Sequence, residues 1–186
     1  MEFPTWFCYE GLAMPIKVSE VTACTRCGLC CDGSLFADVE LASRDEASAL
    51  EVMGLEIEDA DEADRGLLLQ PCGALQGKLC RIYAYRPECC RTFSCRLLQD
   101  VKRGVLGVNR AQAKISAALR RIEHVKELLA PFGPGDESLP LPERCAEALA
   151  LVEASPAKRE TRRMRSELQA AMNSAERFVR GTFLGG

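Results

Sequence analysis

Hydrophobic residues recur with a helical period through the second half of the chain. From about residue 109, apolar side chains are spaced three and four residues apart, which places them on one face of an α-helix that ends before Pro131. This face consists of Ile115, Ala118, Leu119, Ile122, Val125 and Leu129. Similar spacing predicts a short helix over about 143–154 and a longer one over about 157–179, so we expect the second half to be helical.

The first half carries shorter and less regular patterns. Ser43 and Glu46 have the spacing of a capping box, so a helix is expected to start here and to end at Gly54. The acidic stretch 56–65 predicts a solvated loop. Brief apolar segments predict short extended elements at 16–18, 35–41, 67–69 and 79–83. Further along, Arg86-Pro87 is expected to start a helical turn, and a short helix is expected over 94–103.

Together these patterns predict an α+β fold that is mainly α. We expect a small, irregular, cysteine-rich module with short strands over about residues 1–104. A helical segment over about 105–186 is expected to pack on it. The length of 186 residues suits this arrangement, because it can bury one compact core and a helical extension.

Charge and hydropathy exclude some classes of partner. The formal net charge is −3, which does not favour nucleic acid as a partner. No apolar run approaches the roughly 18 residues that a membrane-spanning helix needs, so no membrane contact is expected. The first residues, with Glu2 and no basic segment, do not resemble a secretory signal. These features predict a cytoplasmic protein, in which cysteines stay reduced.

Cysteine usage is the most unusual feature of the chain. There are 11 cysteines, and most of them lie between Cys24 and Cys95. A disulfide framework is the alternative, but the odd number, two adjacent pairs and the expected reducing compartment argue against it. The pattern therefore predicts that thiolates bind metal.

The spacing of these cysteines suggests how a metal is held. Cys24, Cys27 and Cys30 recur every third residue, so a tight turn could bring their sulfurs together. Cys31 points elsewhere, and further ligands must come from the downstream cysteines. The single histidine, His124, is expected on a helix surface and not as a ligand. Soft thiolate sets favour zinc or an iron–sulfur cluster, and the spacing does not separate the two.

Two ordered motifs are similar to those of a known family. C-x-x-C-G-x-C-C at the first cluster is followed by C-x-I-Y-x-x-R-P-x-x-C-R-x-F-x-C, and together they resemble the YkgJ-type cysteine-cluster proteins over about residues 24–95. The resemblance implies a zinc- or iron-chelating domain and kinship with the cysteine domain of flagellin lysine N-methylases. It implies the metal ligands Cys24, Cys27, Cys30, Cys31, Cys72, Cys80, Cys90 and Cys95. Cys89 departs from the motif, which favours Cys90 as the ligand of that pair.

Three functions remain open at this stage. The first is a protein that chelates zinc or an iron–sulfur cluster through these cysteines. The second is an iron–sulfur enzyme of redox or methyl-transfer chemistry, which the methylase kinship suggests, although no glycine-rich G-x-G-x-x-G fingerprint is present for an adenine cofactor. The third is an interaction protein in which the metal is structural.

The number of metal centres, one or two, is also open. Cys145, on an apolar helix face, is expected to be a buried structural thiol.

Overall fold

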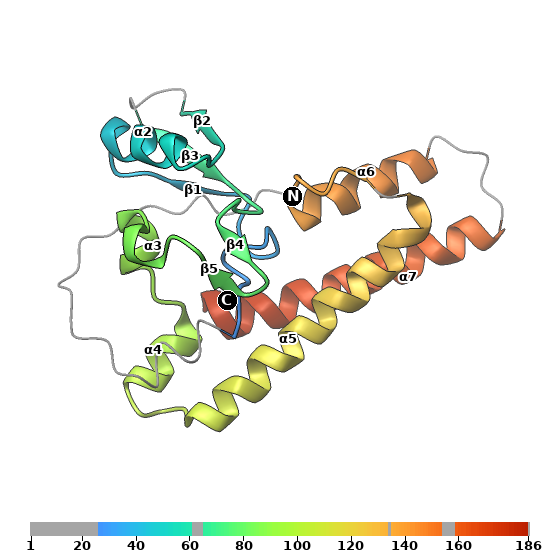
Figure 1. Ribbon diagram of the computed structural model, residues 1–186. Coiled ribbons are helices and arrows are strands. Elements are labelled where there is room, and N and C mark those ends of the chain that lie inside the picture. The colour runs from blue at the N-terminus through green and yellow to red at the C-terminus, as the bar shows by residue number, and fades with distance from the viewer. Residues whose placement is uncertain (1–25, 61–64, 134, 154–158, 186) are drawn as a thin grey trace. The chain divides into compact units, whose positions relative to one another are not determined.

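A computed structural model describes residues 26–60, 65–133, 135–153 and 159–185 of the chain. Contacts divide the chain into two compact units, Met1–Ser94 and Cys95–Gly186. The first holds the short strands and the second holds the long helices (Figure 1). The α+β, mainly α fold class is confirmed. None of the helices in the described ranges has the length and apolar character needed to cross a membrane.

A three-stranded antiparallel sheet forms the framework of the N-terminal unit. Strand β3 (Gly66–Leu69) is central, with β1 (Asp38–Glu40) on one side and β2 (Ile57–Asp59) on the other. The register sets Leu68 opposite Val39 on β1 and opposite Ile57 on β2. Successive side chains alternate between faces, so these three apolar residues share the face that is turned to the core.

Helix α2 (Arg44–Val52) covers this sheet and ends as the sequence predicts. At its start, the Ser43 hydroxyl accepts a hydrogen bond from the Glu46 amide at 3.2 Å. At its end, Gly54 adopts a left-handed φ of 81°, which glycine allows at little steric cost. The amides of Gly54 and Leu55 then donate to the carbonyls of Glu51 and Leu50, which is the hydrogen-bond pattern of a Schellman cap.

The acidic stretch 56–65 is not simply a loop, and that prediction was wrong for part of it. Residues Ile57–Asp59 form β2, whose Ile57 packs against the core while Glu58 and Asp59 are exposed. A single apolar residue between acidic neighbours gave too weak an alternation to indicate a strand. Pairing with β3 stabilises it.

A hairpin and a short helix complete the described part of the N-terminal unit. Strands β4 (Leu75–Gln76) and β5 (Leu79–Cys80) pair antiparallel, with Leu75 opposite Cys80. The strand predicted over 79–83 is thus shorter, and a 3₁₀ turn follows at Tyr83–Tyr85. Helix α3 (Glu88–Thr92) then begins after Pro87, as expected. The short strand predicted at 16–18 lies outside the described residues.

The C-terminal unit consists of helices. Its elements are α4 (Arg96–Lys102), α5 (Val108–Leu129), a 3₁₀ turn (Ala130–Phe132), α6 (Leu141–Glu153), α7 (Arg159–Val179) and a π-helical turn (Arg180–Leu184). Helices α5 and α7 pack along each other (Figure 1). The predicted apolar stripe of α5 faces inward, with Ile115, Ala118 and Val125 all buried. The π-helical turn was not predicted, and it buries Phe183.

Candidate metal centre

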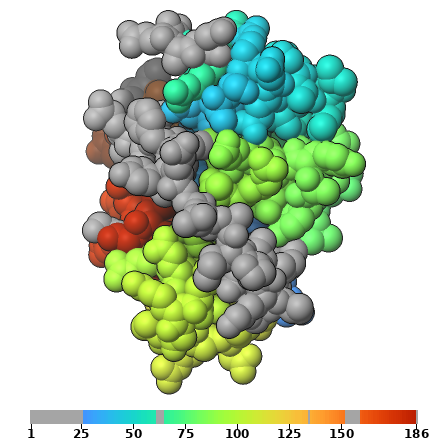
Figure 2. Space-filling view, turned by 90° about the vertical axis from the view of Figure 1, so that its left-hand side faces the viewer, coloured from blue at the N-terminus to red at the C-terminus, as the bar shows by residue number. Residues whose placement is uncertain are grey.

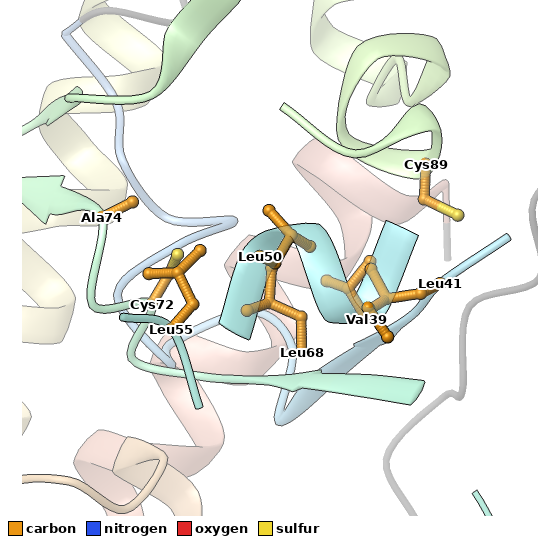
Figure 3. Close-up of a cluster of buried hydrophobic side chains, with 9 residues drawn as sticks. Val39, Leu41, Leu50, Leu55, Leu68, Cys72, Ala74 and Cys89 are labelled. Carbon is orange, nitrogen blue, oxygen red and sulfur yellow. The ribbon is translucent and has the colours of Figure 1, made fainter. Parts of the chain in front are cut away.

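Four free thiols lie against one hydrophobic cluster of the N-terminal unit. Cys72 belongs to that cluster, whose other members come from β1, α2, β3 and the segments after them. Cys31, Cys80 and Cys90 are partly buried and pack against it. We call Cys31, Cys72, Cys80 and Cys90 the core thiol group. In Figure 3 the Cys72 side chain lies beside Leu55 at one end of the cluster.

Backbone hydrogen bonds bring three of these cysteines together from distant parts of the chain. The Cys72 amide donates to the Cys31 carbonyl at 2.8 Å, which joins the first cysteine motif to the end of β3. The β4–β5 hairpin then returns the chain, and the Arg81 amide donates to the Ala74 carbonyl at 2.9 Å. Cys80 is thereby held close to the Cys72 segment.

The turn of the first motif depends on a glycine. Gly28 has a φ of 77°, and its carbonyl accepts the amides of Cys31 and Asp32 at 2.9 and 3.1 Å. A Cβ on Gly28 would approach within 3.6 Å of the Lys78 Cα, so this turn lies against the β4–β5 hairpin. Leu29 is fully buried and anchors the turn in the unit.

Helix α3 supplies the fourth thiol. Cys90 is the third residue of this helix, and α3 is linked to α2 through a carboxylate. Glu46 accepts the Glu88 amide on one oxygen at 2.7 Å and the Ala42 amide on the other at 3.0 Å. Figure 2 shows the surface segment of α2 (blue to cyan) next to the green segment that carries α3.

Burial of Cys31, Cys72 and Cys90 favours neutral thiols at these three positions. Burial raises the pKa of Cys31 to about 12, and the nearby Cys90, Cys72 and Cys80 add to this effect. Burial also raises the pKa of Cys90 to about 12, with further contributions from Cys72, Cys80 and Glu46. The pKa of Cys72 is raised mainly by burial as well. These charge contributions weaken with distance, which agrees with the packing of the core thiol group against one cluster.

Two arginines offset the negative charge that thiolates would carry. Arg81 lowers the pKa of Cys72, and Arg86 lowers the pKa of Cys90, although burial outweighs both effects. The Arg86 guanidinium also lies 3.8 Å from the centre of the Tyr83 ring. Tyr83 is 38 % exposed and makes this cation–π contact at the surface of the unit.

The remaining predicted ligands have different positions. Cys27 and Cys30 are half-buried and lie on the turn of the first motif. Cys24 lies outside the described residues. Cys95 is half-buried and is the N-cap residue at the start of α4 in the C-terminal unit. Across the described ranges, no three His, Cys, Asp or Glu side chains are already arranged around one point as a metal site requires.

The two cysteines of the adjacent pair differ in state. Cys89 is buried and disulfide-bonded, and its sulfur lies 2.8 Å from the Glu40 carbonyl oxygen. Figure 3 places Cys89 beside Leu41, well separated from Cys72. Cys90 is a free thiol of the core thiol group. Successive helical residues point about 100° apart, so only one of the pair can face this group.

Cys145 and His124, which lie outside the motifs, have the environments that the sequence predicts. Cys145 on α6 is 1 % exposed and free, which confirms a buried structural thiol. His124 on α5 is exposed beside Glu127, with 3.6 Å between Nδ1 and the carboxylate. Glu46 is the residue near the thiols that the sequence did not single out. Its capping-box spacing was visible, but the contact of its second oxygen with α3 spans 42 residues.

The chain was compared with known proteins. Neither the curated proteins nor the solved structures gave a match. A family described as "CxxCxxCC: Putative zinc- or iron-chelating domain" matches residues 23–114, which contain both cysteine motifs. The donor set of the N-terminal unit fits this description, because thiolates are soft ligands suited to zinc and iron. Residues 23–114 of the chain therefore belong to the CxxCxxCC family of zinc- or iron-chelating domains.

Proposed function

We propose that the chain chelates zinc or iron through thiolates of its N-terminal unit. Cys31, Cys72, Cys80 and Cys90 are the core of the proposed ligand set. Cys24, Cys27 and Cys30 complete the candidates of this unit, and Cys95, the first residue of the C-terminal unit, is the eighth candidate. The observation that carries the proposal is the meeting of four free thiols from separate segments at one hydrophobic cluster. Without a metal, four thiols at this cluster contribute little that apolar side chains could not contribute as well.

Burial of the thiols suits metal binding more than thiol catalysis. A reactive cysteine needs a lowered pKa and access to solvent, whereas burial raises the pKa of Cys31, Cys72 and Cys90. A divalent cation instead displaces the thiol protons and supplies the charge that a buried thiolate lacks. Arg81 and Arg86 reduce the net negative charge that several thiolates leave around the ion.

The metal itself is identified by analysis of protein purified without oxygen. Zinc, iron and acid-labile sulfide are measured per chain, together with the visible absorption spectrum. Zinc in a colourless protein supports a single-ion site, and iron with sulfide in a brown protein supports a cluster. The cluster is the result that the iron–sulfur enzyme alternative requires. A protein that retains neither metal contradicts the proposal.

The ligand assignment is tested with serine variants. Cys31→Ser and Cys90→Ser should each lower the bound metal, because serine is a poor ligand for a soft cation. The matched control is Cys145→Ser, which also replaces a buried free thiol but lies in the helical unit. Equal metal content in all three variants would refute the proposed ligand set.

The interaction-protein alternative is tested in the same samples. If the metal is only structural, removing it with a chelator should unfold the N-terminal unit, and no metal should leave the unit while it stays folded. If the unit instead acts as a metal carrier, bound zinc should pass to a competing chelator while the far-UV circular dichroism of the chain persists. Metal transfer and unfolding are therefore followed together during titration with the chelator.

A further inference from the structure

We propose that Glu46 is a positioning residue, which holds helix α3 so that the Cys90 thiol stays with the core thiol group. This inference rests on the proposed function, since its consequence is retention of the metal. Glu46 is half-buried and lies on the first turn of α2. In the sequence it belongs to neither of the two cysteine motifs.

The carboxylate joins two elements with its two oxygens. One oxygen accepts the Ala42 amide at 3.0 Å, and Ala42 lies just before the N-cap residue of α2. The other accepts the Glu88 amide at 2.7 Å, which is the first amide of α3. An ionised carboxylate accepts such bonds more strongly than a neutral group. Glu46 therefore fixes the beginning of α3 to the beginning of α2.

Helix α3 lacks a side-chain cap of its own, although its second residue, Cys89, is also held by a disulfide and lies 2.8 Å from the Glu40 carbonyl oxygen. The helix contains five residues, and the residue before it, Pro87, has no side chain that can cap it. The Glu88 amide would normally be near a capping side chain of the preceding residue, and proline offers none. The carboxylate of Glu46 accepts this amide instead. Cys89 holds one side of this short helix, so we infer that the bond from Glu46 to Glu88 sets the rotation of its first turn and with it the direction of Cys90.

The negative charge of Glu46 works against the metal ligand that it positions. Glu46 raises the pKa of Cys90, since two negative charges near each other are unfavourable. If Glu46 acted only through its negative charge, it would make the Cys90 thiolate harder to form. The geometry and the charge of Glu46 predict opposite effects on metal affinity, and this makes the two roles separable.

The experiment uses the full chain and zinc as the probe. Dissociation constants are measured by competition with a chromophoric chelator for the wild type, Glu46→Ala and Glu46→Asp. Alanine removes both hydrogen bonds and the charge, and aspartate keeps the charge but is too short to reach both amides. We expect both variants to raise the zinc dissociation constant about 10-fold or more, as loss of groups that orient metal ligands does. A tighter or unchanged constant in Glu46→Ala overturns the inference.

Two controls separate positioning from general stability and from charge. Ser43→Ala removes the hydroxyl that caps α2 but does not touch α3. It should lower the stability of the unit and leave the zinc constant within about twofold of the wild type. Glu51→Gln removes one negative charge from the exposed part of the same helix and should leave the constant unchanged. If Ser43→Ala weakens zinc binding as much as Glu46→Ala, the role of Glu46 is merely structural.

A second readout does not depend on the metal. The amides of Arg91 and Phe93 donate to the carbonyls of Pro87 and Cys89, so their hydrogen exchange reports on the order of α3. In chelator-treated protein, Glu46→Ala and Glu46→Asp should speed their exchange severalfold, and Ser43→Ala should not. Unchanged exchange refutes the positioning role even if the wild type binds zinc. If the wild type binds neither zinc nor iron, the proposed function fails, while accelerated exchange still supports the link between Glu46 and α3.

Discussion

The substitution Gly66→Ala tests the close packing of α2 on the sheet. Gly66 is a buried residue of β3, and its carbonyl accepts the Leu41 amide at 2.9 Å. A Cβ at this position would come 2.5 Å from the Ile57 Cγ2, 3.0 Å from the Ala47 Cβ and 3.3 Å from a Leu41 methyl carbon. The backbone φ is not left-handed, so the expected effect is steric.

The magnitude follows from these three contacts. Real Cβ atoms essentially never approach another heavy atom as closely as 2.5 Å, so Ile57 has to move. Ala47 is fully buried on a helix and has no flexible side chain that could give way. Overpacking of this kind costs about 1–3 kcal/mol, and alanine recovers about 0.5–1 kcal/mol through the unfolded chain. Because the 2.5 Å contact places this site at the upper end of the overpacking cost, we expect Gly66→Ala to reduce the free energy of unfolding by about 2 kcal/mol.

The measurement is urea unfolding of metal-free protein, read by hydrogen exchange in peptides that cover β3. This readout follows the N-terminal unit separately from the helical unit. Ile57→Ala removes the nearest atom, so the double variant should be less destabilised than the sum of the single variants by about 1 kcal/mol. Gly181→Ala is the control, because a Cβ there meets nothing within 4 Å. Additive effects of the two substitutions, or a neutral Gly66→Ala, would refute the packing argument.

Three further predictions concern caps and buried groups. Ser43→Ala should cost about 1 kcal/mol in urea unfolding, because it removes the acceptor for the Glu46 amide, and a loss equal to that of the exposed Asp45→Ala would contradict this role. Burial raises the pKa of Cys145 from 9.0 to about 11. Alkylation of Cys145 at pH 8 should therefore be roughly 100-fold slower than alkylation of an exposed thiol, and equal rates in folded and urea-unfolded protein would refute the burial. Phe183→Ala should cost about 3–5 kcal/mol in the thermal unfolding of the helical unit, since Phe183 is 2 % exposed, and a change below 1 kcal/mol would show that the π-helical turn adds little to the core.

The sequence predicted the elements whose signals are local. The apolar stripe runs through most of the 22-residue helix α5, so its period is unambiguous. Helix α2 has Ser43 at one end and Gly54 at the other, and both act through bonds to neighbouring residues. These features need no knowledge of the rest of the fold, and they were predicted to within a few residues.

The sequence failed where a distant partner decides the structure. Strand β2 exists because Ile57 pairs with Leu68, and three residues among acidic neighbours carry no clear period. The π-helical turn after α7 continues a helix that the pattern ended at residue 179, and burial of Phe183 extends it. Glu46 resembles an ordinary capping residue until α3 is placed beside it.

The sequence likewise indicated one part of the candidate site and not the other. The spacing of the two motifs identified the cysteines, and Cys31, Cys72, Cys80 and Cys90 meet at one core. The spacing did not indicate that these thiols are part of the hydrophobic cluster itself. It also gave no sign that Cys89 is disulfide-bonded. The full set of eight ligands and the module boundary near residue 104 stay predictions.

The hydrogen bond between Cys72 and Cys31 has a consequence for the order of folding. It closes a loop of about forty residues, so the N-terminal unit must form non-local contacts, which are slow because loop closure costs entropy. The helices of the second unit can form locally within about a microsecond. Translation of Cys95–Gly186 at about 5–20 residues per second takes roughly 5–20 s. During synthesis, the unit that folds more slowly is thus exposed first and has this interval in which to collect its cysteines.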